Sequence, residues 1–249
     1  METRYKNIKL VIEYDGTNYS GWQRQKDCPS IQGFIESAIS KMTRQQITLI
    51  GSGRTDAGVH AWQQVANFKC QTRLNPKQFL NGLNSLLPDD IAIHSCVEVS
   101  GEFHARYDVK SKVYRYYIGQ RPHKMALFHQ FCWPIPYKLD ISKMQNASVL
   151  FEGTHDFKSF EGSGSPRSTS VRTILRSSVI LNDNQYIIYE IEADGFLRFM
   201  VRNIVGTLVE IGKKRLPYES ILHILDCRDR HQAGPTAPPQ GLFLIEVKY

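Results

Sequence analysis

Hydrophobic positions in the first half of the chain alternate in short runs, and two longer stretches with helical spacing lie between these runs. Strand-like alternation occupies residues 8–14, 47–50, 63–69 and 91–99. Helices are predicted over residues 31–42 and 76–87, with Ser30 at the N-cap of the first and Pro88 ending the second. The first helix is expected to bury one apolar face, formed by Ile31, Phe34, Ile35, Ala38, Ile39 and Met42.

The second half of the chain repeats this order of elements. Strands are predicted at residues 107–119, 171–182, 186–193 and 242–248, and helices at 141–151, 197–213 and 217–226. Asn182-Asp183-Asn184 is a turn signal between two of these strands. The doubled order is typical of two ferredoxin-like halves, each with helices on one face of a mainly antiparallel sheet. An α+β fold is therefore predicted, divided into residues 1–106 and 107–249.

The composition is that of a folded, basic protein. Of the 249 residues, 41% are hydrophobic and 22% are charged, which argues against a disordered or collagen-like chain. Lys and Arg exceed Asp and Glu by 31 − 24 = +7. This balance favours a polyanion such as nucleic acid as a partner, although a basic enzyme without such a partner fits the charge equally well.

Targeting and cysteine patterns indicate a reduced environment. The uncharged stretch 125–137 is too short to span a membrane and contains Pro134 and Pro136. The first residues do not resemble a secretory signal peptide, and the five cysteines form no Cys-x-x-Cys pair. We therefore expect a cytoplasmic protein that does not associate with membranes.

The segment Gly51-Ser-Gly-Arg-Thr-Asp-Ala-Gly-Val-His60 is too small and polar to be core. Its spacing fits neither a dinucleotide-binding fingerprint nor a P-loop. Asp56 either caps backbone amides in a turn or serves as a catalytic carboxylate, a nucleophile or base that a nearby guanidinium keeps ionised. Arg54, two residues earlier, is close in sequence.

A second unusual segment is Asp194-Gly-Phe-Leu-Arg-Phe-Met-Val-Arg-Asn-Ile-Val-Gly206, in which Arg198 and Arg202 lie four residues apart on a predicted helix. Such a pair usually forms a solvated face. The apolar neighbours of Arg202 favour instead a partly buried guanidinium, which requires a carboxylate, and Asp56 is a candidate. Gly206 is expected to permit close helix packing.

Basic and aromatic residues interleave between Phe103 and Ile118. The basic residues are Arg106, Lys110, Lys112 and Arg115, and the aromatic ones are Tyr107, Tyr114, Tyr116 and Tyr117. This pattern suits phosphate contact combined with base stacking. The alternative is that the tyrosines pack within the sheet, which their β-propensity alone would explain.

The stretch 161–170 is rich in Gly, Ser and Pro and is expected to be a flexible surface loop. A functional alternative is a lid or substrate-binding loop, with Arg167 and Arg172 available for phosphates. The eight histidines show no metal-ligand spacing, and no cluster of acidic residues suggests a two-metal site.

Several of these segments resemble the bacterial tRNA pseudouridine synthase A family, and the matches follow one another in order over nearly the whole chain. The matching strings are Tyr14-Asp-Gly-Thr-Asn-Tyr-Ser-Gly-Trp-Gln-Arg-Gln25, Gly53-Arg-Thr-Asp-Ala-Gly-Val-His60, Phe103-His-Ala-Arg106, Tyr114-Arg-Tyr116, Met200-Val-Arg-Asn-Ile-Val-Gly206, Ala233-Gly-Pro-Thr-Ala-Pro238 and Gly241-Leu-Phe-Leu244. The resemblance implies the pseudouridine synthase fold, in which two ferredoxin-like halves flank a central active-site cleft.

The resemblance also implies an activity. Such an enzyme isomerises uridine to pseudouridine at positions 38, 39 and 40 of the tRNA anticodon stem-loop, acts as a homodimer, and needs no cofactor or metal. Asp56 would be the catalytic aspartate and Arg202 its partner. Tyr114 would pack on the target base, and Arg54 would help displace and hold the target nucleotide, because a base inside a helix must be extruded before chemistry.

Two other functions are weighed against this isomerase. A non-catalytic RNA-binding module would bind tRNA and leave its nucleosides unchanged, and Asp56 would then have no explanation. A metal-dependent nuclease or phosphotransferase would shorten the RNA or release phosphate in a chelator-sensitive way.

Overall fold

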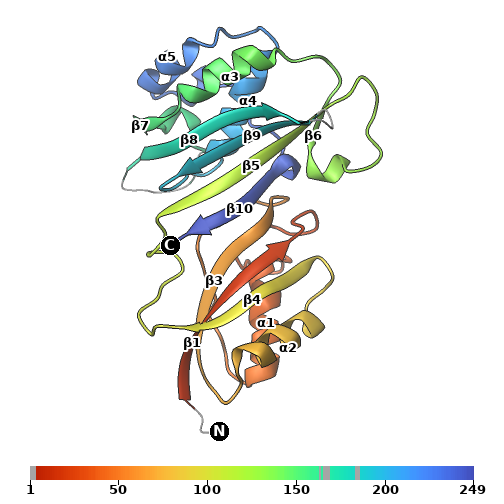
Figure 1. Cartoon of the computed structure of the whole chain (residues 1–249), viewed down its shortest axis with the longest axis vertical. Helices are drawn as coiled ribbons and strands as arrows, with labels where there is room; N and C mark the ends of the chain where they lie inside the picture. Colours follow the sequence, from red (N-terminus) through yellow and green to blue (C-terminus); the bar gives the residue numbers. More distant parts are fainter. Residues whose placement is uncertain (1–3, 163, 165–168, 183–185) are drawn as a thin grey trace. The chain divides into compact units, whose positions relative to one another are not determined.

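The computed structural model describes residues 4–162, 164, 169–182 and 186–249 (Figure 1). These residues form two compact units. The first comprises the chain up to Lys110 together with Leu244–Tyr249, and the second comprises Ser111–Phe243.

The first unit has the strand order expected of a ferredoxin-like half. Its elements are β1 (Arg4–Tyr14), α1 (Ile31–Thr43), β2 (Ile50–Gly51), β3 (His60–Thr72), α2 (Pro76–Leu86) and β4 (Ile91–Val99). The pairs β4–β1, β1–β3 and β3–β2 are all antiparallel, which gives the order β4-β1-β3-β2. The final strand, β10 (Leu242–Lys248), begins in the second unit and returns to the first, where it lies beside β3.

The core of the first unit lies between this sheet and the two helices. Alternate residues of β1, namely Ile8, Leu10 and Ile12, are fully buried. Most of the predicted apolar face of α1 is buried as well, but Phe34 is 42% exposed and packs edge-on against Tyr19. Ser30 occupies the N-cap of α1 without a side-chain capping bond.

Two predicted strands of the sequence are shorter in the structure. Of residues 47–50, only Ile50 belongs to a strand, because the backbone N–H of Leu49 donates to the buried carboxylate of Glu36. The strand predicted from residue 107 begins at Ser111, since the N–H groups of Tyr107 and Asp108 donate to the carbonyl of His104 in a turn.

The second unit is also α+β, with a mixed, mainly antiparallel sheet. Its elements are β5 (Ser111–Gln120), β6 (Trp133–Ile135), α3 (Ile141–Val149), β7 (Gly153–Asp156), β8 (Val171–Leu181), β9 (Tyr186–Ala193), α4 (Met200–Gly212) and α5 (Ser220–Cys227), with short 3₁₀ turns at His129–Phe131, Lys158–Phe160, Arg230–Gln232 and Pro239–Gly241. The strands follow the antiparallel order β5-β9-β8-β7, while β6 runs parallel to β5. The predicted fold class is confirmed; β6 and β7 were not predicted.

In the second unit α3 starts at Ile141 as predicted, whereas α4 and α5 start later than their sequence pattern predicts. Phe199 has a φ of 60°, a left-handed conformation that excludes it from the helix, so α4 begins at Met200. Pro217 lies three residues before α5, and its carbonyl accepts the N–H of Ser220. Of the predicted turn Asn182-Asp183-Asn184, residues 183 and 184 lie outside the described residues.

Candidate active site

Asp56 lies on the loop between β2 and β3 in the first unit. Its side chain is half-buried, while Arg54 on the same loop has an exposed side chain. The N–H of Val59 donates to the carbonyl of Asp56 at 3.2 Å, so the chain turns tightly directly after this residue. The carboxylate is thus reachable by a ligand and partly shielded from bulk water.

Buried polar side chains from β1 and β3 hold this loop in place. The hydroxyls of Tyr14 and Thr55 are hydrogen-bonded at 2.7 Å, and burial raises the pKa of the Tyr14 phenol, which therefore stays protonated. Gln64 accepts from the Ser52 hydroxyl at 2.6 Å and donates to the carbonyl of Gly53 at 3.0 Å. Satisfied networks of this kind fix residues 52–55, which directly precede Asp56.

The segment from Tyr14 to Gln25 packs directly against the Asp56 loop. The backbone N–H of Trp22 donates to the carbonyl of Thr55 at 3.1 Å. At Gly21, a Cβ would lie 2.6 Å from that carbonyl oxygen, and at Gly51 a Cβ would lie 2.6 Å from the Trp22 ring. These close approaches explain the glycines in both strings.

A second network ties Arg24, which belongs to the same 14–25 segment, to α1. The buried carboxylate of Glu36 accepts from Leu49 N at 2.9 Å and from Gln32 Nε2 at 3.0 Å, and its other oxygen lies 3.1 Å from Arg24 Nη1. The Arg24 side chain is 58% exposed, so the guanidinium is tethered at one end and open to solvent at the other. Sequence reasoning assigned no role to Arg24. The available signal was the pair of polar residues, Gln32 and Glu36, four positions apart on the helix.

In the second unit, Tyr114 and Arg202 both contact the segment that leads into α4. Tyr114 is buried on β5 and meets the Phe196 ring edge-to-face, with 5.0 Å between centroids. Arg202 is half-buried; its Nε donates to the carbonyl of Ala237 at 2.8 Å, and its guanidinium lies 4.9 Å from the centroid of the Phe199 ring.

The segment 233–238 is bound to α4 by side chains that sequence reasoning missed. The Thr236 hydroxyl donates to Oδ1 of the fully buried Asn203 at 2.6 Å. Arg230 Nη2 donates to that Asn203 oxygen at 3.0 Å and to the Thr236 hydroxyl at 3.1 Å. A Cβ at Gly206 would lie 1.6 Å from the carbonyl oxygen of Pro235. Gly206 thus permits close packing against the helix, as expected, and the backbone of 233–238 is what packs there.

The basic and aromatic strand pattern divides into two parts. Tyr114 and Tyr116 are buried in the sheet, as the packing alternative predicted, and the Tyr116 hydroxyl donates to the carbonyl of Pro238 at 2.7 Å. Arg115 is paired with Glu190 at 2.6 Å. Tyr107, by contrast, is 75% exposed.

The loop 161–170 is described only in part. Arg167 and the other residues of 165–168, together with residue 163, lie outside the described residues. Arg172 lies at the start of β8, where its Nη1 donates to the carbonyl of Thr169 at 3.2 Å.

The four residues predicted for the site therefore fall into two pairs. Asp56 and Arg54 share one loop of the first unit, and Tyr114 and Arg202 lie around the 196–199 segment of the second. The pairing of Arg202 with Asp56 stays a prediction. Within the described ranges, no three His, Cys, Asp or Glu side chains are grouped as metal ligands, and no helix is long and apolar enough to cross a membrane.

Comparison with known proteins identifies the class. A family model described as tRNA pseudouridine synthase matches residues 10–108 and 147–249, ranges that include Arg54, Asp56 and Arg202. The chain therefore belongs to the tRNA pseudouridine synthase family.

The chain is similar over its length to proteins that are each named tRNA pseudouridine synthase A. Over 244 residues, 98% of this chain and 100% of each relative, identity is 48% with the protein of Acetivibrio thermocellus, 45% with that of Thermoanaerobacter sp. (strain X514) and 41% with that of Clostridium acetobutylicum. Among solved structures, an archaeal box H/ACA sRNP Nop10-Cbf5 complex aligns with a TM-score of 0.38 and 11% identity, covering 82% of this chain and 43% of that one.

Proposed function

We propose that this protein isomerises uridine to pseudouridine at positions 38, 39 and 40 of the tRNA anticodon stem-loop. The observation that carries the proposal is the family match along both halves of the chain, combined with the half-buried Asp56 on a loop braced by buried side chains. The excess of basic residues, 31 − 24 = +7, suits a polyanionic substrate.

The reaction balances within the nucleotide itself. The bond from ribose C1′ to uracil N1 breaks, the base turns, and a bond from C1′ to C5 forms. The proton lost from C5 is matched by a proton gained at N1, so the isomerisation consumes no oxidant, reductant or group donor. One well-placed carboxylate, acting as nucleophile or base, suits such a reaction.

Four side chains receive roles in this proposal. Asp56 is the catalytic carboxylate, and Arg202 keeps it ionised, because partial burial disfavours the charged form and an adjacent guanidinium favours it. Tyr114 packs on the target uracil, and Arg54 holds the nucleotide once it has left the helical stack.

We further propose that the protein works in the cytoplasm as a homodimer with the anticodon arm of tRNA as its partner. The reaction is that of an intramolecular transferase, within the isomerase class.

Substitution of Asp56 tests the proposal. Unmodified tRNA transcript is incubated with the protein, digested and analysed for pseudouridine, and the modified positions are mapped. The unchanged protein should produce pseudouridine confined to the anticodon arm. Asp56→Asn should lower turnover by about 10³-fold or more while tRNA affinity stays within a few-fold, because the amide keeps the shape and loses the charge.

The matched control is Asp89→Asn, which neutralises an exposed carboxylate of the same unit and should leave turnover unchanged. Turnover retained by Asp56→Asn would refute the catalytic assignment. Bound tRNA with unaltered nucleosides would favour a plain RNA-binding module, and chelator-sensitive cleavage would favour a nuclease.

A further inference from the structure

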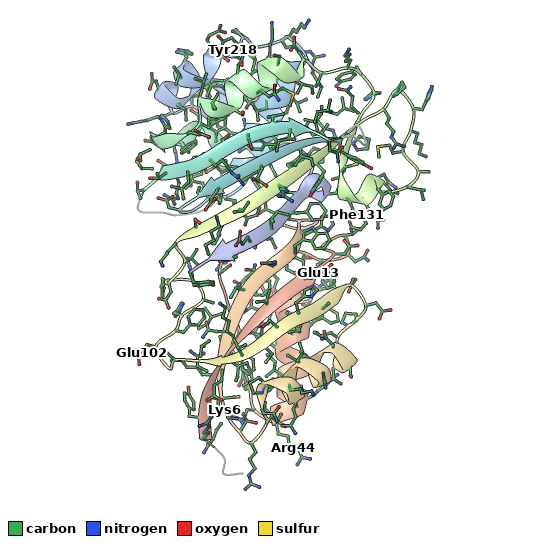
Figure 2. All side chains as sticks on the ribbon, viewed as in Figure 1. Lys6, Glu13, Arg44, Glu102, Phe131 and Tyr218 are labelled. Carbon is green, nitrogen blue, oxygen red and sulfur yellow. The ribbon has the colours of Figure 1, made fainter. Side chains whose placement is uncertain are left out.

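The turn at residues 103–108, which follows β4, displays an aromatic surface in the first unit; the adjacent Glu102 is labelled in Figure 2. Tyr107 is 75% exposed. The His104 ring stacks on it, with 4.2 Å between centroids and 27° between planes. The guanidinium carbon of Arg106 lies 5.9 Å from the Tyr107 centroid. One ring face is thus covered by His104, and a cation lies close by.

Hydrogen bonds within the turn fix the position of the His104 ring. Its Nδ1 accepts the N–H groups of Arg106 at 3.2 Å and of Tyr107 at 3.3 Å. The backbone N–H of His104 donates to the Asp108 carboxylate at 2.9 Å. The stacked pair is therefore held by the backbone of its own turn.

Two buried asparagines anchor the turn to the sheet. Asn7 donates to the carbonyls of Ser100 at 2.7 Å and Phe103 at 2.9 Å. Asn67 donates to Asn7 Oδ1 at 2.8 Å and accepts the N–H of Ala105 at 2.9 Å. The two side-chain amides are hydrogen-bonded to each other and to the backbone of the turn, so the network holds the turn in one position.

The last residue of the chain braces the same turn from another direction. The Tyr249 hydroxyl donates to the carbonyl of Ala105 at 2.7 Å, and its ring packs on Phe103 with 5.1 Å between centroids. The Lys9 ammonium lies 4.6 Å from the centroid of the Tyr249 ring. The turn is therefore rigid although its tip is exposed.

We propose that Tyr107, backed by His104 and flanked by Arg106, is a stacking platform for one unpaired nucleobase of the RNA substrate, with Arg106 contacting the neighbouring phosphate. This inference rests on the proposed function and adds a binding subsite separate from Asp56. A single exposed ring is ordinary on a protein surface, but the Tyr107 ring is backed by the His104 ring, lies near the Arg106 cation and stands on a braced turn, which suits a ligand with a flat face and a negative charge. A base accompanied by a phosphate matches both the ring and the cation.

The test compares Tyr107→Leu, which keeps an apolar side chain and loses the ring, with Tyr107→Phe, which keeps the ring. Affinity for unmodified tRNA transcript, KM and kcat are measured, with thermal melting as a check on folding. Tyr107→Leu should weaken binding about 5- to 150-fold, the range expected for one base stacked on an aromatic ring, with the change in KM and little change in kcat. Tyr107→Phe should bind like the unchanged protein.

The control is Tyr5→Leu, which removes a similarly exposed tyrosine (70%) from β1 of the same unit and should leave affinity unchanged. Equal affinity of Tyr107→Leu and the unchanged protein would overturn the platform, as would equal losses for Tyr107→Leu and Tyr107→Phe. A change in self-association without a change in RNA affinity would assign the surface to a second copy of the chain and overturn it too. Failure of the unchanged protein to form pseudouridine would refute the proposed function alone. The tRNA affinities of the Tyr107 variants would still test whether a base stacks on this ring.

Discussion

At the scale of single residues, the Asp56 loop depends on backbone contact with Gly21. Gly21 has a φ of +94°, a conformation that side chains rarely adopt, and a Cβ there would lie 2.6 Å from the carbonyl oxygen of Thr55. The neighbouring Trp22 donates to that same carbonyl. The glycine thus allows the 14–25 segment to lie directly against the backbone of Thr55, the residue before Asp56.

Gly21→Ala should therefore affect both stability and catalysis. The left-handed backbone and the steric contact together should lower the free energy of unfolding by about 2 kcal/mol, and displacement of the loop should reduce turnover tenfold or more. Thermal melting and pseudouridine formation measure the two effects. In the control Gly101→Ala, no atom lies within 4 Å of the added Cβ, so the melting temperature should stay unchanged. Equal turnover in all three proteins would show that the loop tolerates the shift.

At the scale of secondary-structure elements, α4 is a binding surface for the 233–238 segment as much as a helix of the core. Ala237 exchanges hydrogen bonds with Arg202, donating to its carbonyl at 3.1 Å and accepting from its Nε at 2.8 Å. Gly206, one turn further along the helix, leaves room for the Pro235 carbonyl. The position of Arg202 is therefore set partly by a segment more than thirty residues away in sequence.

For Gly206→Ala, helix propensity and tertiary packing predict changes of opposite sign in the free energy of unfolding. Propensity alone would raise stability by about 1 kcal/mol. The added Cβ would lie 1.6 Å from the Pro235 oxygen, and overpacking of this kind costs about 1–3 kcal/mol, so we expect a net loss of stability. Turnover should fall as well, because Ala237 moves away from Arg202. Denaturant unfolding measures whether the free energy of unfolding rises or falls.

The control for this prediction is Gly33→Ala in α1, where the nearest atom is the Ser30 hydroxyl at 3.0 Å. A hydroxyl at the end of a side chain gives way more readily than a carbonyl of the backbone, so this change should be much less destabilising. A stabilised Gly206→Ala protein would contradict the packing argument.

At the scale of the whole molecule, the net charge of +7 is the property that bears on tRNA binding. Lys and Arg side chains that neutralise phosphates release the counterions condensed on RNA. This release contributes less to the binding free energy as the salt concentration rises. Because pseudouridine formation requires a folded tRNA to bind first, salt should act on KM before it acts on kcat.

Affinity for tRNA should therefore fall steeply with KCl concentration. A plot of log affinity against log salt should have a slope of about −0.7 to −0.9 for each phosphate neutralised. Filter binding or fluorescence anisotropy between 50 and 200 mM salt, as rough limits, measures this slope. An affinity that does not change with salt would contradict the view that Lys and Arg side chains bind the phosphates of the RNA.

Local pattern was sufficient to predict most of the helices and strands. The strands predicted at 91–99 and 242–248 coincide with β4 and β10, because alternation reports a half-buried strand directly. The small, polar run 51–60 was not expected in the core and was therefore a candidate site. Ser52, Thr55, Val59 and His60 are nevertheless buried, and the catalytic role of Asp56 stays a prediction. Residues 47–49 were misassigned because Leu49 bonds to a side chain rather than to a strand.

The sequence by itself determined most of the elements, their doubled order and the family strings, because backbone periodicity and short motifs are properties of neighbouring residues. Only the tertiary structure decided that Tyr107 is exposed while Tyr114 and Tyr116 are buried, and that Asn7 meets Asn67 beneath the 103–108 turn. These outcomes depend on contacts between residues 60 or more positions apart, where no local pattern restricts which side chains meet. Tertiary packing determines which side chains are buried, because it excludes water from some surfaces and leaves others exposed.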